Sequence, residues 1–153
     1  MKKIYNFEKI SDLLYCSGQP TEVQLQQLAG EGYHIIVNLG LLNTKYALPE
    51  EASTVETLGM QYFHIPVVFE NPKLNELTDF IDFMNIHADE KTLVHCAANY
   101  RASAFMGLYL FSKSELTEEE MHEFIDDVWQ PNTVWQAFIK DALAFLTKRI
   151  GNS

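Results

Sequence analysis

The residues best suited to chemistry lie together in one segment, His95-Cys96-Ala97-Ala98-Asn99-Tyr100-Arg101. A loop of mostly small residues there separates a thiol from a guanidinium. Successive backbone N–H groups in such a loop can converge on an anion, and a guanidinium can hold two phosphate oxygens through paired hydrogen bonds. The segment therefore predicts an oxyanion-binding loop, with the phosphate-binding residues Ala97, Ala98, Asn99, Tyr100 and Arg101.

Cys96 is the candidate nucleophile of this loop. Free cysteine has a pKa of ~8.5, whereas cysteines at helix N-termini or beside cations have values of ~3.5–7.5. Because Cys96 precedes a predicted helix and lies close to Arg101, we expect the thiolate to be favoured there. An ionised sulfur that faces a bound phosphorus atom can form a covalent intermediate, while the loop amides and Arg101 stabilise the charge on the transferring group.

Apolar periodicity predicts the strands and helices that position Cys96. Residues 92–95 form a short apolar run that predicts a buried strand ending at Cys96. Other strands are predicted at residues 13–17, 34–39 and 62–65, and helices at residues 21–29, 49–58, 74–84, 100–111, from residue 117 and around residues 135–146. This alternation indicates an α/β domain whose largely parallel sheet is covered on both faces. Ligands bind such sheets at the carboxyl edge of the strands, which is where Cys96 lies.

Side-chain patterns also predict what is buried and what is exposed. Thr21 and Gln24 have the spacing of a capping box, and the helix that follows has an apolar side made of Val23, Leu25, Leu28 and Ala29. Trp129, Trp135 and Phe138 are expected in the core. The acidic residues between Glu115 and Asp127 are expected to form a solvated face.

Composition limits the class of protein. The chain has 153 residues, 47% of them hydrophobic and 21% charged, which predicts a single domain over residues 1–153. No apolar run approaches the ~20 residues of a membrane span, and the first residues lack the features of a signal peptide. The expected location is therefore cytoplasmic. A net charge of −10 argues against nucleic-acid and anionic-membrane partners, because both need a basic surface.

Cysteine and histidine usage predicts no metal site, and the chemistry of a cysteine nucleophile requires no cofactor. The chain has two cysteines, too few for a zinc cage or a disulfide framework. The histidines outside the loop are scattered without ligand spacing. Cys16 is expected to pack in a strand.

The loop and several upstream segments resemble a known family. His-Cys, a small-residue loop, Arg and a helix are similar to the signature of the protein tyrosine phosphatase superfamily. The segments 14–21, 37–39 and 59–67 resemble, in the same order, the small bacterial dual-specificity-like phosphatases. The resemblance covers roughly residues 10–112 and implies a tyrosine-phosphatase-like three-layer fold, with a central, mostly parallel sheet of about four to five strands flanked by helices.

The sequence departs from that family at four points, of which the last is the position of Ser103. The family places five residues between Cys and Arg, whereas four stand between Cys96 and Arg101. Asn99 replaces the usual loop glycine and tolerates a left-handed backbone better than most residues. The family takes a general acid from the loop after the third strand, where Glu70 is the carboxylic acid of this chain. Proton transfer of that kind is typically worth ~10²–10⁴-fold in rate.

Two further residues are expected to support the loop. His95 is predicted to be a hydrogen-bonding residue that positions the loop. Ser103 stands one position beyond the place where the family has a hydroxyl, and it is predicted to bond the thiolate or the loop.

Three functions fit these residues. The first is a cysteine-dependent phosphatase that acts on a phosphorylated substrate through a Cys96-phosphate intermediate. The second is a catalytically dead relative whose loop binds phosphate or another small oxyanion. The third is a rhodanese-like sulfurtransferase, whose loop is one residue shorter than that of the phosphatases and so matches the spacing from Cys96 to Arg101.

Overall fold

The computed structural model describes residues 3–151. Its centre is a five-stranded sheet with the order β1-β2-β5-β3-β4. The strands are β1 (Glu8–Ser11), β2 (Leu14–Ser17), β3 (Ile35–Asn38), β4 (Gln61–His64) and β5 (Thr92–His95). β1 is antiparallel to β2, whereas the pairs β2–β5, β5–β3 and β3–β4 are parallel. The predicted, mostly parallel sheet is confirmed.

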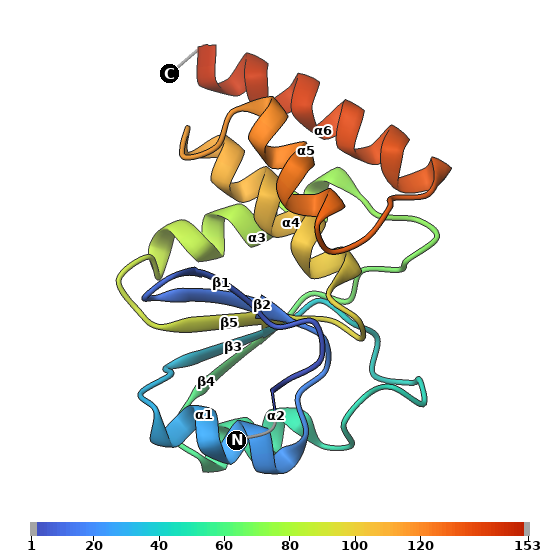
Figure 1. Cartoon of the computed structure of the whole chain (residues 1–153). Helices are drawn as coiled ribbons and strands as arrows, with labels where there is room; N and C mark the ends of the chain where they lie inside the picture. The colour runs from blue at the N-terminus through green and yellow to red at the C-terminus, as the bar shows by residue number, and fades with distance from the viewer. Residues whose placement is uncertain (1–2, 152–153) are drawn as a thin grey trace.

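Helices cover both faces of this sheet (Figure 1). They are α1 (Glu22–Gly30), α2 (Glu51–Thr57), α3 (Leu74–Ile86), α4 (Tyr100–Ser112), α5 (Glu118–Asp126) and α6 (Thr133–Gly151). α1 and α2 lie on one face, and α3 to α6 lie on the other. The core is divided in the same way, since Leu25 and Leu93 share one apolar cluster while Val94 and Trp135 share a larger one. The predicted three-layer α/β fold is confirmed.

β5 carries the candidate nucleophile to its place. It pairs with β2 on one side and β3 on the other, and all four of its residues are buried. Side chains alternate between the two faces of a strand. Leu93 therefore packs toward α1 and α2, and Val94 toward α4. The same alternation directs His95 toward α2 and Cys96 toward α4.

Local sequence patterns predicted most, but not all, of these elements. The capping box at the start of α1 is present, with the Thr21 side chain accepting from the Gln24 N–H and the Gln24 side chain accepting from the Thr21 N–H. β1 was not predicted, because its edge segment alternates between half-buried and exposed residues and contains only Ile10 as an apolar side chain. Val23 is 60% exposed, so its assignment to the buried side of α1 was wrong.

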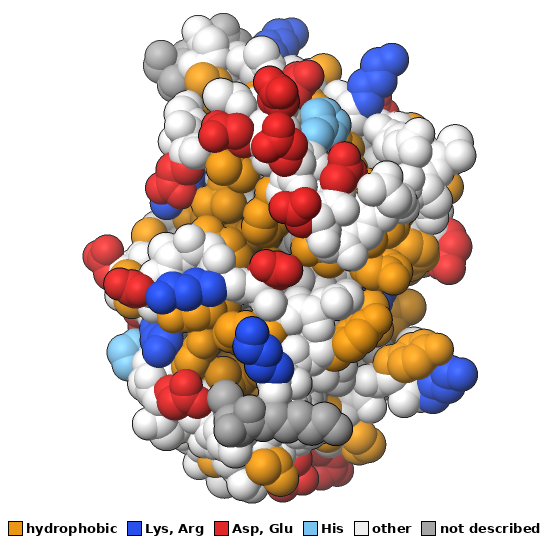
Figure 2. All heavy atoms as spheres, viewed as in Figure 1, with side chains coloured by type: hydrophobic (Ala, Val, Ile, Leu, Met, Phe, Trp, Pro, Cys, Tyr) orange, Lys and Arg blue, Asp and Glu red, His pale blue; other side chains and the backbone are white. Residues whose placement is uncertain are grey.

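The surface agrees with the acidic composition. Figure 2 shows acidic side chains gathered over the upper part of the molecule, where α5 lies. The predicted solvated face is confirmed, since its acidic residues from Glu115 to Asp127 are all exposed. Within residues 3–151, no helix is both long enough and apolar enough to cross a bilayer.

Candidate active site

The loop that follows β5 joins directly to α4. Cys96 is 1% exposed and lies at the carboxyl end of β5. Asn99 stands at the N-cap position of α4 with φ 71°, in the left-handed region, as its residue type predicted. This turn starts the helix at once and places Arg101 in its first turn.

The loop and the first turn of α4 offer a run of free donors. No residue in the described part of the chain accepts a hydrogen bond from the backbone N–H of Ala97, Ala98, Tyr100, Arg101 or Ala102, whereas the Asn99 N–H faces β2 through the isolated bridge between Gly18 and Ala98. The first N–H groups of a helix have no partner within the helix, and its dipole adds positive potential at that end. The segment between Cys96 and Arg101 is therefore built to bind an oxyanion.

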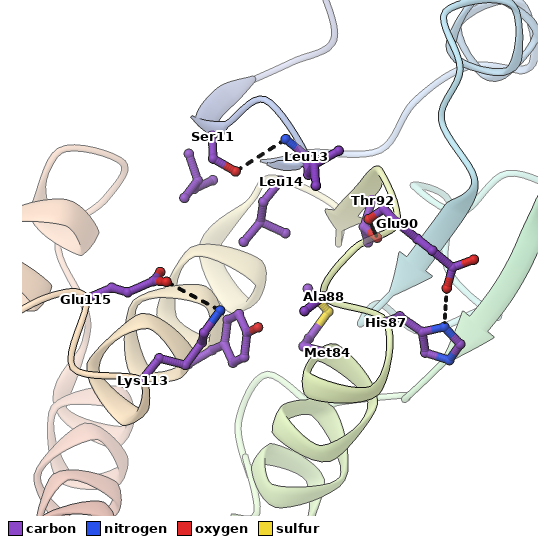
Figure 3. A pocket seen from close by; sticks show the side chains of 12 residues that line it. Ser11, Leu13, Leu14, Met84, His87, Ala88, Glu90, Thr92, Lys113 and Glu115 are labelled. Atoms are coloured by element: carbon purple, nitrogen blue, oxygen red, sulfur yellow. Dashed lines mark hydrogen bonds and ion pairs between the residues drawn. The ribbon is translucent and has the colours of Figure 1, made fainter.

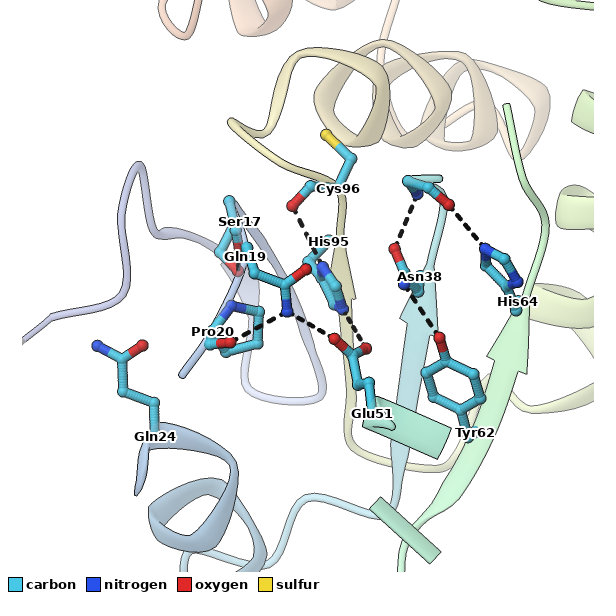
Figure 4. Close-up of polar contacts among 12 residues, drawn as sticks. Ser17, Gln19, Pro20, Gln24, Asn38, Glu51, Tyr62, His64, His95 and Cys96 are labelled. Atoms are coloured by element: carbon cyan, nitrogen blue, oxygen red, sulfur yellow. Dashed lines mark hydrogen bonds and ion pairs between the residues drawn. The ribbon is translucent and has the colours of Figure 1, made fainter. Parts of the chain in front are cut away.

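Behind the loop, His95 belongs to a buried hydrogen-bonded chain (Figure 4). Its Nε2 lies 2.7 Å from a carboxylate oxygen of Glu51, and its Nδ1 lies 3.2 Å from the Cys96 carbonyl oxygen. The Gln19 amide donates to the other Glu51 oxygen over 2.5 Å. His95 and Glu51 are almost fully buried. This geometry agrees with the predicted role of His95 in positioning the loop, which stays a prediction.

Glu51 is a site residue that sequence reasoning missed. It lies in the first turn of α2, where an acidic residue is common because of the helix dipole. The burial of its carboxylate indicates a role in the site, but this burial arises only when α2 packs beside the end of β5. In the sequence, Glu51 simply follows Pro49 and Glu50 at a helix start, and nothing there indicates that it contacts His95, which lies 44 positions later.

A second polar chain orders the neighbouring strand end (Figure 4). The Asn38 amide donates to the Tyr62 hydroxyl over 3.0 Å and its oxygen accepts the Gly40 N–H over 2.8 Å. His64 Nε2 lies 2.7 Å from the Gly40 carbonyl. Burial raises the pKa of Tyr62 to about 12, so this hydroxyl stays protonated. A Cβ at Gly40 would stand only 3.2 Å from the Asn38 Oδ1, so glycine leaves room for the hydrogen bond between this oxygen and the Gly40 N–H.

Arg101 faces a narrow pocket beside the loop. Gly40, Tyr46 and Ala97 also line this pocket, whose volume is about 10 Å³. No carboxylate in residues 3–151 forms an ion pair with Arg101, and its charge is left for an anion.

The loop that carries Glu70 is held against this site. Arg101 Nη1 donates to the Val67 carbonyl over 2.8 Å, and Trp135 Nε1 donates to the Phe69 carbonyl over 2.7 Å. The Arg101 guanidinium also lies 6.0 Å from the centre of the Phe69 ring. Glu70 itself is exposed and forms no hydrogen bond or ion pair with the described residues. Its loop is thus placed at the site, while contact between its carboxylate and a substrate stays a prediction.

Tyr100 and Ser103 point into packing contacts. The Tyr100 ring is stacked on Trp129 with centroids 4.7 Å apart. The buried Ser103 hydroxyl donates to the Tyr100 carbonyl over 3.1 Å. The Ser103 hydroxyl therefore forms its hydrogen bond within α4. The predicted bond from Ser103 to the thiolate stays a prediction.

The two cysteines are both free and differ in their surroundings. Cys16 lies in β2, fully buried. Burial raises its pKa to about 12, an effect that the nearby Asn99 amide partly offsets. Cys16 therefore stays a protonated core thiol, as its place in a strand predicted.

A larger pocket lies at the other end of β5 (Figure 3). It has a volume of about 280 Å³, and Leu14, Met84 and Thr92 are among its lining residues. A Lys113–Glu115 ion pair of 3.4 Å stands at its edge. Because Thr92 begins β5 and Cys96 follows its end, this pocket is separate from the nucleophile.

Glu51→Gln is expected to lower the free energy of unfolding by about 1–3 kcal/mol, because one of the two oxygens that face Gln19 and His95 is replaced by an NH₂ group, which cannot accept a hydrogen bond. Urea unfolding measures the change. Glu50→Gln is the matched control, since the adjacent Glu50 is exposed and surface changes usually stay within ~0.5 kcal/mol. Equal stability of the two variants would show that the buried chain does not stabilise the fold.

Several solved structures similar to this chain are phosphatases. One is "Putative phosphatase (DUF442)" from Shewanella putrefaciens CN-32, which is 33% identical, has a TM-score of 0.86 and is matched over 94% of each chain. Tk-PTP in its active form is 21% identical over 94% of this chain and 97% of its own, with a TM-score of 0.72. PTPMT1 is 16% identical over 96% of this chain and 99% of its own, with a TM-score of 0.77.

These similarities differ in what they show. Tk-PTP and PTPMT1 share too little sequence with the chain to show more than the fold. No family model and no curated protein matches the sequence. The Shewanella protein, in contrast, is one-third identical over nearly the whole of both chains. The chain therefore belongs to the DUF442 family and has the fold of the protein tyrosine phosphatase superfamily.

Proposed function

We propose that this protein is a cysteine-dependent phosphatase that hydrolyses phosphate monoesters through a Cys96-phosphate intermediate. The observation that carries the proposal is the set of unpaired N–H groups at Ala97, Ala98 and the first turn of α4, with Cys96 before them and Arg101 in that turn. Preorganised donors of this kind stabilise the charge on a transferring group. The family relationship supports the same reaction class.

The reaction runs in two steps. Cys96 sulfur attacks the phosphorus, an S–P bond forms, the ester P–O bond breaks, and Glu70 gives its proton to the leaving oxygen. Water then attacks the phosphorus, Glu70 takes up a proton from it, and the S–P bond breaks. The products are an alcohol and inorganic phosphate, with Cys96 and Glu70 returned to their starting states.

Arg101 and the loop amides hold the phosphoryl oxygens in both steps. A guanidinium has five N–H donors, and the bond to the Val67 carbonyl leaves others for the anion. That bond also links the anion-binding residue to the loop of Glu70. The spacing of four residues leaves one amide fewer than in the family's usual loop. Because the left-handed Asn99 starts α4 at once, the first N–H groups of the helix lie directly beside the shorter loop.

The proposed substrate carries an isolated phosphate monoester. PTPMT1 has been crystallised with PI(5)P, but a net charge of −10 disfavours polyanionic ligands and nucleic acid here. We place the enzyme in the cytoplasm, where its two free thiols fit a reducing environment. Residues 1–153 are proposed to act as one phosphatase domain.

Cys96→Ser is expected to reduce hydrolysis of an aryl phosphate to background between pH 5 and 8, because a serine hydroxyl is a far weaker nucleophile at these pH values. Release of the phenol measures turnover, and Cys16→Ala is the control for loss of a thiol. Turnover that survives Cys96→Ser would contradict the proposal. A wild type that binds phosphate without turnover would support the anion-binding alternative, and thiocyanate formation from thiosulfate and cyanide would support sulfur transfer.

Glu70→Gln is expected to lower kcat by about 10²–10⁴-fold for an alkyl phosphate. The effect should be small for a dinitrophenyl phosphate, because this leaving group departs without a proton. Steady-state kinetics with both substrates measure the difference, and Glu56→Gln, at an exposed position on α2, is the matched control. An equal loss with the two substrates would rule out Glu70 as the general acid.

Iodoacetate at pH 6–8 is expected to label Cys96 and not Cys16 in the folded protein. The pKa of Cys16 is raised to about 12, so that thiol remains protonated throughout this range, and it becomes reactive when urea unfolds the chain. Peptide mass spectrometry identifies the labelled residue, and inorganic phosphate should slow the labelling. Preferential labelling of Cys16 would contradict the assignment of the nucleophile.

A further inference from the structure

The segment around Asn6 lies directly against the anion-binding loop. The Asn6 amide donates to the Ala98 carbonyl over 3.0 Å, and the Asn99 amide donates to the Asn6 carbonyl over 2.9 Å. We propose that Asn6 is a positioning residue of the active site, which keeps the loop amides free for the phosphate. The inference rests on the proposed function, since it assigns Asn6 to that same site.

The first part of the argument is the direction of the loop carbonyls. The Ala97 carbonyl accepts the Gln19 N–H over 3.0 Å, and the Ala98 carbonyl accepts the Asn6 amide. In a trans peptide the C=O and the next N–H point in opposite directions. The bond from Gln19 to the Ala97 carbonyl therefore turns the Ala98 N–H to the opposite side of the loop, and the bond from Asn6 to the Ala98 carbonyl fixes the peptide that leads into Asn99.

The second part is the direction of the Asn99 side chain. An asparagine at an N-cap normally accepts an N–H from the first turn of its helix. Asn99 makes no such bond to α4, and its amide is bound to the Asn6 carbonyl instead. The first-turn N–H groups of α4 therefore remain available to an anion because Asn6 holds Asn99 away from them.

Asn6 is itself fixed by the chain around it. It has φ 49°, a left-handed conformation that asparagine tolerates. Ile4 is buried in the core on the α1–α2 side, and the Phe7 ring stacks on Tyr15. Gly18 N–H donates to the Tyr5 carbonyl over 2.7 Å. A Cβ at Gly18 would stand 2.7 Å from the Ala97 carbonyl, so glycine is what lets this segment and the loop approach each other.

The experiment measures binding of inorganic phosphate by isothermal titration calorimetry. Asn6→Gly keeps the left-handed backbone accessible and removes the side-chain amide. The dissociation constant for phosphate is therefore expected to rise about 5- to 10-fold, which corresponds to the loss of one hydrogen bond. Ser114→Gly is the matched control, because Ser114 is also left-handed, with φ 61°, and exposed. If Asn6→Gly does not fold, Asn6→Ser, whose hydroxyl is too short to reach the Ala98 carbonyl, replaces it.

Thermal unfolding of the same variants separates positioning from stability. We expect the Tm of Asn6→Gly to stay close to that of Ser114→Gly while its phosphate binding weakens. A lowered Tm with unchanged phosphate binding overturns the inference, as does a wild type that binds no phosphate. A wild type that binds phosphate but hydrolyses no aryl phosphate overturns the phosphatase proposal and leaves the role of Asn6 standing.

Discussion

An anion site at the start of α4 requires backbone N–H groups that no other part of the protein occupies, and the surrounding structure meets this requirement. Polar backbone groups in folded proteins nearly always find a partner, yet no residue in the described part of the chain accepts from the N–H groups of Ala97, Ala98 or the first turn of α4. The left-handed Asn99 starts α4 at this place, and the helix start and the Arg101 guanidinium both add positive potential there. The result is a local anion site on a chain of net charge −10.

The loop is supported from both faces of the sheet, because strand alternation sends neighbouring residues in opposite directions. On the α2 side, His95 carries the contact from Glu51 to the Cys96 carbonyl. On the α4 side, Arg101 and Trp135 hold the two carbonyls that flank Val68 in the loop of Glu70. The nucleophile and the loop of its candidate acid are thus joined through Arg101.

Local patterns in the sequence predicted the strand, loop and helix around Cys96 well. β5 and α4 lie where the apolar run and the helical composition placed them, and Asn99 has the left-handed backbone that its residue type allowed. Such features depend on neighbours in the chain and so can be read locally. β1 was missed and Val23 was wrongly assigned to a buried side. Both depend on what packs beside an edge strand or a helix surface, and neighbours in the chain do not show this.

The sequence by itself determined the chemistry of the loop, since a thiol, small residues, a guanidinium and a helix start within one short segment define the available nucleophile and donors. Only the tertiary structure decided which residues support it. Glu51 lies 44 positions from His95, Trp135 lies 66 from Phe69, and Asn6 lies 92 from Ala98. No periodicity links residues so far apart, because their contacts form only when the parallel strands bring the ends of β2, β3 and β5 to one edge of the sheet.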